Sequence, residues 1–156
     1  MSTPAVTTAR RDGVMIVHLD DGKANALSFE VIAALNEAIG EAEADESVGA
    51  LVITGRPGRF SAGFDLGVMF GEDMSAIIDL VADGGALVHR LYGCQVPVVA
   101  ACTGHALAAG ALVLLGCDVR VGADIDAKVG LNEVAIKMVL PDWDFTIAGD
   151  RLSNRH

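Results

Sequence analysis

The feature that most constrains this chain is a stretch from Pro97 to Asp118 with no Lys, Arg, Asp or Glu before its last residue. It reads PVVAACTGHALAAGALVLLGCD. A stretch of this length could cross a membrane as one helix, since a spanning helix needs about 20 apolar residues. Alternatively, it lies in the core of a folded domain or forms part of a functional site.

The composition of the stretch divides it into shorter elements. Pro97-Val98-Val99 favours extended structure, Thr103-Gly104-His105 indicates a break, and Gly116 stops the apolar run that precedes it. A membrane span would have a basic cluster or a belt of Trp and Tyr at its flanks, and neither is present. We therefore predict a strand over 97–102, a turn, and a buried helix over 106–115, with no membrane association.

The rest of the chain alternates apolar runs of strand type with longer runs of helical spacing. The expected strands are 14–19 with a hairpin partner at 3–9, then 50–54, 117–121 and a short piece after Lys128. The expected helices are 28–44 and 74–92, and 56–70 is predicted to be irregular. This alternation favours an α/β fold with parallel crossovers, and 156 residues suit one domain.

Charge and cysteine content limit the partners and the compartment. The formal net charge is -10, with no basic stripe, which argues against nucleic acid as a partner. Cys94, Cys102 and Cys117 have apolar neighbours and no framework spacing. We expect reduced, buried thiols in a cytoplasmic protein.

Common cofactor and metal motifs are missing from the sequence. It contains neither the glycine pattern of a dinucleotide site nor that of a phosphate-binding loop, and Ser61 is not in G-x-S-x-G. The four histidines are too far apart for metal-ligand spacing. We expect no cofactor and no metal.

Two segments expose backbone where a ligand could reach it. The predicted helix begins with small residues, Ala106, Ala108, Ala109 and Gly110, and the first N–H groups of a helix lack partners. Ser61-Ala62-Gly63 offers another uncovered stretch. The alternatives are that small residues only allow close helix packing, and that 61–63 is an ordinary loop.

Four segments together resemble the crotonase superfamily, also called the enoyl-CoA hydratase/isomerase family. They are DGKANALS, FSAGFDL, PVVAACTGHALAAGALVLLGCDVRVGA and GLNEVAIKMVLP, in this order. The resemblance implies that 1–156 forms a single core domain, an α/β crotonase-like spiral of β-β-α units of the ClpP/crotonase type, in a homo-oligomer such as a trimer or a pair of trimers. Family members usually continue beyond His156, so we expect the C-terminal helical part to be largely missing.

The resemblance also implies acyl-CoA thioester substrates, with coenzyme A as part of the substrate. The backbone N–H groups of Phe64 and Ala109 would form an oxyanion hole, although the family more often has Gly at the second position. Glu133 would be the catalytic carboxylate. The alternative for Glu133 is a solvated surface glutamate.

Hydratases of this family use two glutamates, and here the place of the first is taken by Leu112. Moving a double bond needs only one base, so the resemblance favours a 3-enoyl-CoA to 2-enoyl-CoA isomerase over a hydratase. A non-catalytic acyl-CoA binder and a truncated remnant that associates with homologous subunits remain as alternatives.

The same four segments imply the contacts with substrate or coenzyme A. These are Lys23, Ala24, Ala26, Ala62, Gly63, Asp65, Leu66, Ala108, Leu112, Asn132 and Pro141. We expect Lys23 to meet the coenzyme A phosphates or adenine, with Arg56 and Arg59 as the next candidates, and Asp65 to hold its loop. Trp143 is expected to form a pocket wall, and Lys137 replaces a glycine that is usual in the family.

Overall fold

The computed structural model describes residues 4–133 and 139–153. Its elements, in chain order, are β1 (Val6–Arg11), β2 (Val14–Leu19), β3 (Ala26–Leu27), α1 (Phe29–Ala44), β4 (Ala50–Gly55), β5 (Gly58–Ser61), β6 (Gly63–Phe64), α2 (Leu66–Met69), α3 (Met74–Tyr92), β7 (Val98–Cys102), β8 (Gly104–Leu107), α4 (Ala109–Gly116), β9 (Val119–Gly122), β10 (Val129–Gly130) and α5 (Asp142–Arg151).

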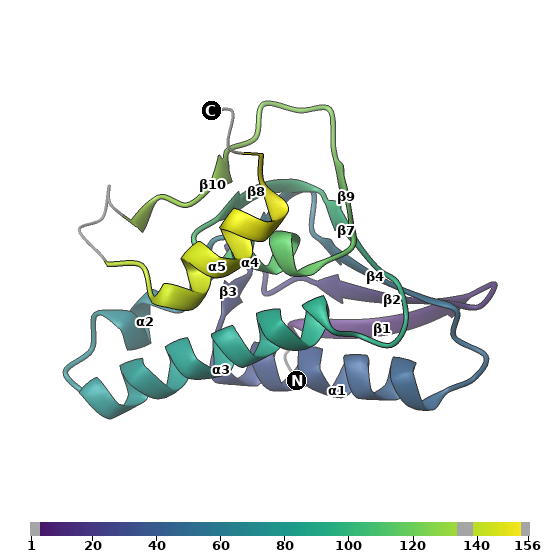
Figure 1. Ribbon diagram of the computed structural model, residues 1–156, viewed down its shortest axis with the longest axis horizontal. Helices are drawn as coiled ribbons and strands as arrows, with labels where there is room; N and C mark the ends of the chain where they lie inside the picture. The colour runs from purple at the N-terminus through teal and green to yellow at the C-terminus, as the bar shows by residue number, and fades with distance from the viewer. Residues whose placement is uncertain (1–3, 134–138, 154–156) are drawn as a thin grey trace.

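The main sheet carries β1, β2, β4, β7 and β9 side by side in that order (Figure 1). β1 and β2 form an antiparallel hairpin across Asp12-Gly13, and the other neighbours are parallel. Asp12 and Gly13 both have positive φ, 49° and 78°, as a tight turn between twisted strands requires. The predicted hairpin is confirmed, with its first strand at Val6–Arg11 rather than 3–9.

A repeating unit builds the rest of the fold. After β2, β4 and β7 the chain leaves the main sheet, forms a short strand (β3, β5 and β8 respectively), and reaches a helix (α1, α3 and α4), with β6 and α2 inserted between β5 and α3. The short strands pair in smaller sheets, one ordered β10-β8-β5 and one made of β3 and β6. This is the predicted spiral of β-β-α units.

Two long helices lie next to each other along one side of the main sheet (Figure 1). α1 starts after Ser28, whose Oγ accepts a hydrogen bond from Val31 N at 3.3 Å. α3 starts after Asp73, whose Oδ1 accepts hydrogen bonds from Ser75 N and Ala76 N. Such caps satisfy donors that the helix itself leaves unpaired. Both helices match their predicted ranges.

The charge-free stretch forms β7, β8 and α4. Every residue of α4 is buried, so the prediction that this stretch belongs to the core is confirmed. The predicted helix start at Ala106 is wrong. Gly104–Leu107 is a strand, because it pairs with β5 on one side and β10 on the other. None of the helices in the described part of the chain is both long enough and apolar enough to cross a membrane.

Four smaller differences from the sequence-based expectations concern the loops and the C-terminal region. Residues 56–70 are not irregular throughout, since they contain β5, β6 and α2. The strand expected at 117–121 begins only at Val119, and α5 was not expected. Cys102 and Cys117 are buried, but Cys94 is only half-buried, so the expectation of three buried thiols is wrong for Cys94. Lys137 lies outside the described residues.

Candidate functional site

A cavity of about 560 Å³ opens between the small strands, α2, α3 and the segment that leads into α5. Figure 1 shows these elements gathered at one end of the molecule. Its lining consists of Ala62, Phe64, Leu66, Met69, Ile77, Val81, Leu107, Ala108, Leu112, Asn132, Glu133, Val139, Leu140, Pro141 and Asp144. Among these residues only Glu133 and Asp144 are ionisable, so the cavity is apolar apart from these two carboxyl groups and the Asn132 amide.

The first uncovered backbone segment, at β6, lies directly against the start of α4. Gly63 has a φ of 92°, and a Cβ built on it would stand 3.2 Å from Ala109 N and 2.9 Å from Ala108 Cβ. Only glycine therefore allows this approach. Asp65 N donates to Leu27 O at 3.2 Å, and N–H groups point to alternate sides along a strand. The Phe64 N–H therefore points away from β3, and Phe64 is also one of the residues that line the cavity.

The second backbone donor belongs to the first turn of α4. Among the described residues, the non-glycine positions with positive φ are Asp12, Asn25 and Ala108, so Ala109 has an ordinary φ. The unusual conformation falls one residue earlier, at Ala108, with φ 51° and ψ -129°. The Ala109 N–H belongs to the first turn of the helix, where N–H groups have no acceptor within the helix.

Glu133 is buried, with only 7% of its surface exposed. Its Oε2 has no hydrogen-bond partner among the described residues, and neither has Oδ1 of its neighbour Asn132. The alternative of a solvated surface glutamate is therefore wrong. Leu112 is also buried in the cavity wall, so the side chain at the place of the family's first glutamate is apolar.

Asp144 is a candidate that the sequence reasoning missed. It lies in the first turn of α5, is 2% exposed, and lines the same cavity as Glu133. Burial, and to a smaller extent the charge of Glu133, raises the pKa of Asp144 to about 7. The signal in the sequence was weak, an aspartate shortly after Pro141, which is typical of a helix start.

The segment predicted to meet coenzyme A is held in place by buried Asn25. The Asn25 Nδ2 donates to Leu19 O at 2.8 Å, and to Arg59 O and Phe60 O at 3.2 Å. Ser61 Oγ donates to Asn25 O at 2.7 Å and accepts from Gly63 N at 3.2 Å. These contacts join the loop of Lys23 to the loop of Gly63, and sequence reasoning missed Asn25 too.

Asp21 organises the same loop from its exposed side. Its carboxylate accepts from Lys23 N at 2.7 Å, Asn25 N at 2.9 Å and Ala26 N at 3.1 Å. Burial alone would raise the pKa of Asp21, but these donors, helped by the Arg56 guanidinium, outweigh it and leave the pKa below its usual value.

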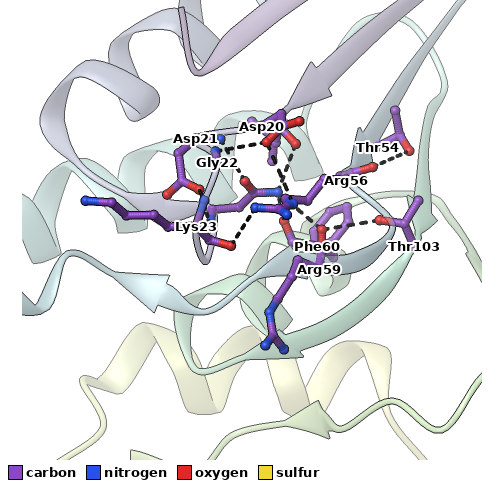
Figure 2. A network of polar contacts seen from close by, with 12 residues as sticks. Asp20, Asp21, Gly22, Lys23, Thr54, Arg56, Arg59, Phe60 and Thr103 are labelled. Carbon is purple, nitrogen blue, oxygen red and sulfur yellow. Dashed lines mark hydrogen bonds and ion pairs between the residues drawn. The ribbon is translucent and has the colours of Figure 1, made fainter. Parts of the chain in front are cut away.

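A second depression, of about 530 Å³, lies beside this loop and is lined by several cationic side chains. Its lining is Gly22, Lys23, Arg56, Pro57, Gly58, Arg59 and His105. Arg56 is occupied, with Nη1 donating to Lys23 O at 3.1 Å and Nε 3.8 Å from Asp20 Oδ1. Figure 2 shows the Lys23 and Arg59 side chains extending away from this network. Among the described residues neither forms an ion pair.

The structure brings together most, but not all, of the residues predicted for the site. Those that line the cavity are Ala62, Phe64, Leu66, Ala108, Leu112, Asn132, Glu133 and Pro141. Gly63 and Ala109 lie directly behind its wall, and Asp65 caps α2 by accepting from Gly67 N at 2.7 Å. Lys23 lies in the separate cationic depression. Ala24 and Ala26 join the two, since Ala24 O accepts from Ala62 N at 3.0 Å and Ala26 pairs with Gly63.

Trp143 does not line the cavity. Its ring lies against α3, where a Cβ on Gly85 would stand 3.0 Å from the indole nitrogen. It lines a different groove with Tyr92 and Asp150. Trp143 therefore forms a wall, but of that groove rather than of the site.

The sequence profile described as enoyl-CoA hydratase/isomerase matches residues 9–149. The chain belongs to this family. The predicted resemblance to the crotonase superfamily is thus confirmed, and so is the fold class. A solved structure named as an enoyl-CoA isomerase of Mycobacterium tuberculosis superposes with a TM-score of 0.90 at 43% identity, covering 96% of this chain and 64% of that one. Another structure from Mycobacterium tuberculosis, named as a probable enoyl-CoA hydratase, superposes with a TM-score of 0.91 at 43% identity, covering 96% of this chain and 63% of that one.

Curated relatives in the family carry both kinds of name. The mitochondrial enoyl-CoA delta isomerase 1 of Mus musculus is 34% identical over 140 residues, which cover 88% of this chain and 48% of the mouse protein. A putative enoyl-CoA hydratase of Thermus thermophilus is 38% identical over 139 residues, covering 81% of this chain and 51% of that protein. The chain thus spans about half the length of the curated relatives it matches.

Proposed function

We propose that this chain binds an acyl-CoA thioester and converts a 3-enoyl-CoA into a 2-enoyl-CoA. The observation that carries the proposal is the buried carboxyl of Glu133 in a mostly apolar cavity whose lining includes Phe64 and Ala108, the residue directly before Ala109. Leu112 in the same wall supports isomerisation over hydration, because it removes one of the two carboxylates that hydratases of the family use.

In the proposed reaction Glu133 removes a proton from C2, next to the thioester carbonyl. The electron pair of the broken C–H bond moves into the C1–C2 bond, and negative charge develops on the thioester oxygen. The N–H groups of Phe64 and Ala109, together with the helix dipole of α4, stabilise that charge where it forms. Glu133 then returns the proton at C4, which leaves the double bond between C2 and C3.

One observation favours water addition as the second candidate. Asp144 provides a second carboxyl in the cavity, from an element different from the one that carries it in hydratases of the family. Two carboxyl groups can activate a water and protonate carbon together. The two activities are distinguished by which substrate is consumed.

We place the coenzyme A phosphates or adenine over the cationic depression. Lys23 and Arg59 support this placement because both side chains extend away from the hydrogen-bonded loop (Figure 2). The whole chain carries a formal net charge of -10, so a local group of cations is needed to attract an anionic ligand.

The proposal includes a cytoplasmic homo-oligomer, such as a trimer, that needs no cofactor besides the coenzyme A of its substrate. Free thiols at Cys94, Cys102 and Cys117 support a reducing compartment. Association is supported by β9, an edge strand of the main sheet, where Val119 and Val121 are 50% and 57% exposed.

The experiment follows the absorbance of the conjugated enoyl thioester with a 3-enoyl-CoA in one cuvette and a 2-enoyl-CoA in another. We expect a rise in the first and no change in the second. Glu133→Gln should lower kcat by about 10³-fold, since a positioned base contributes 10²–10⁴. Glu37→Gln makes the same change on the exposed face of α1 and should leave the rate unaltered.

A fall in the second cuvette would instead indicate hydration. Near-normal turnover by Glu133→Gln would contradict the role of this residue. Silence in both cuvettes would contradict the enzyme proposal, and calorimetric titration with an acyl-CoA would then separate a binder from a remnant that binds nothing.

A further inference from the structure

Asp144 presents an unexplained carboxyl to the cavity that holds Glu133. It is 2% exposed, and its Oδ1 has no hydrogen-bond partner among the residues the structure describes. The Oε2 of Glu133 is in the same condition. Buried carboxyl oxygens without partners are costly, so two of them in one apolar cavity point to an interaction between the two groups.

Asp144 is held firmly by its helix. Its N–H donates to Pro141 O at 3.1 Å, and two neighbours on α5 anchor it to the rest of the protein. The Trp143 ring lies against Gly85 of α3, and Ile147 is buried in the core. The carboxyl is therefore fixed by packing, whereas Glu133 follows a two-residue strand.

Glu133 is the one ionisable neighbour of Asp144 among the described residues that line the cavity. Burial is the larger cause that raises its pKa to about 7, and the charge of Glu133 adds to it. α4, which packs against α5, has no ionisable side chain between Ala109 and Gly116, and the Cys117 thiol follows it. On the α3 side, the groove beyond Trp143 contains His89, Tyr92 and Asp150. On α5 itself Asp142 is exposed. The Arg151 Nε lies 3.9 Å from Asp150 Oδ2, and the Arg151 guanidinium stacks over the Tyr92 ring.

We propose that protonated Asp144 is a positioning residue that donates a hydrogen bond to the Glu133 carboxylate and orients it as the single base of the cavity. Asp144 keeps its proton throughout, so no atom is transferred. The bond gives both unpartnered oxygens a partner and leaves one negative charge where two would repel. The catalytic meaning of this bond rests on the proposed function, but the bond itself does not.

The first test therefore needs no turnover. Carbon-13 NMR of side-chain carboxyl groups, titrated from pH 4 to 9 on the whole chain, should show the Asp144 signal titrating near pH 7. In Glu133→Gln the midpoint should move down, because the charge that opposes ionisation is gone. A midpoint near the ordinary aspartate value, or one unaffected by Glu133→Gln, would overturn the proposal.

The second test compares pH profiles of kcat/KM for the isomerisation. We expect the native rate to fall above about pH 7, where Asp144 loses its proton. Asp144→Asn keeps the shape and a donor but cannot ionise, so the alkaline fall should disappear while the rate at pH 6 stays within a few-fold. Asp144→Leu should lose about 10- to 100-fold at pH 6, where the native Asp144 is protonated, since a hydrogen bond to a charged group is removed.

Asp142→Asn, the same substitution on the exposed side of the same helical turn, serves as the control and should keep the native profile. If Asp144→Asn retains the alkaline fall at the native pH, the proposal is wrong even though isomerisation stands. If no substrate turns over but the NMR midpoint still responds to Glu133→Gln, the hydrogen bond stands and the proposed function is wrong.

Discussion

At the scale of single residues, Asn25 makes polar contacts that join the two parts of the candidate site. This side chain is 3% exposed and its backbone has a φ of 54°, in the left-handed region that asparagine tolerates better than most residues. Its side-chain amide donates hydrogen bonds to the carbonyl groups of Leu19, Arg59 and Phe60, so it connects the cationic depression to the segment of Gly63. A change here alters both candidate subsites at once.

Asn25→Ala is expected to lower the free energy of unfolding by about 2 to 4 kcal/mol. The loss combines buried carbonyls left without donors with the strain of alanine in a left-handed conformation. Urea unfolding followed by circular dichroism measures it. Asn25→Gly keeps the conformation without strain and should lose about 1 kcal/mol less. Equal losses would show that the backbone conformation contributes nothing.

At the scale of elements, α4 starts from a strained residue. Ala108 has φ 51° and ψ -129°, a combination that residues with a Cβ rarely adopt, and strain of this kind costs about 1–3 kcal/mol. Ala108→Gly is therefore expected to raise the free energy of unfolding by about 1 kcal/mol, after the added chain entropy of glycine is subtracted. Denaturant unfolding at equilibrium measures this change.

The neighbouring alanine provides the control. Ala109 has an ordinary φ inside the helix, so Ala109→Gly should lower stability by about 0.5–1 kcal/mol. Opposite signs for two adjacent Ala→Gly changes would locate the strain at Ala108. A loss of stability in both variants would contradict it.

The elements that the sequence predicted well are those whose signals are local. α1 and α3 combine helical spacing with a capping residue, Ser28 and Asp73, and their ranges match. β8 was mistaken for the start of a helix because its small apolar residues suit either structure. What makes it a strand is its pairing with β5 and β10, which lie about 45 residues before it and about 20 residues after it in the sequence.

The site divides in the same way. Phe64, Ala109 and Glu133 could be named because each lies in a segment with family resemblance. Asp144 could not be named, because its raised pKa depends on burial and on the charge of Glu133, which only the fold brings near it. Asn25 lay inside a quoted segment, yet its role depends on carbonyl groups of Leu19, Arg59 and Phe60 that only the fold brings within reach.

At the scale of the whole molecule, two features make stability depend on pH in the same direction. The formal net charge of -10 implies self-repulsion that grows as carboxyl and imidazole groups lose their protons. Asp144 adds a local effect, since its pKa rises from about 3.9 in an unfolded chain to about 7 in the folded one. Between these values the folded state binds more protons, so the free energy of unfolding falls as the pH rises.

The loss of stability caused by ionising Asp144 is thus absent below about pH 4 and complete above about pH 7. Its upper limit is about 4 kcal/mol, at roughly 1.4 kcal/mol per pKa unit. Groups with a lowered pKa affect the free energy of unfolding in a different, more acidic pH range. Glu43, whose pKa is lowered mainly by the hydrogen bond from Gln95 N, loses its contribution only in more acidic solution. The window from pH 5 to 8 therefore isolates Asp144 and the general repulsion.

Salt separates the two remaining causes, because it screens exposed charges strongly and buried ones weakly. Urea unfolding from pH 5 to 8, at low and at about 1 M salt, should show a decline of the free energy of unfolding that salt reduces but does not abolish. Asp144→Asn should remove the part that persists at high salt and should be more stable than the native chain at pH 8. Asp142→Asn removes one exposed charge and should change only the salt-sensitive part. If high salt abolishes the decline in the native chain, repulsion between surface charges is its whole cause, and Asp144 ionises in the folded state as readily as an exposed aspartate does.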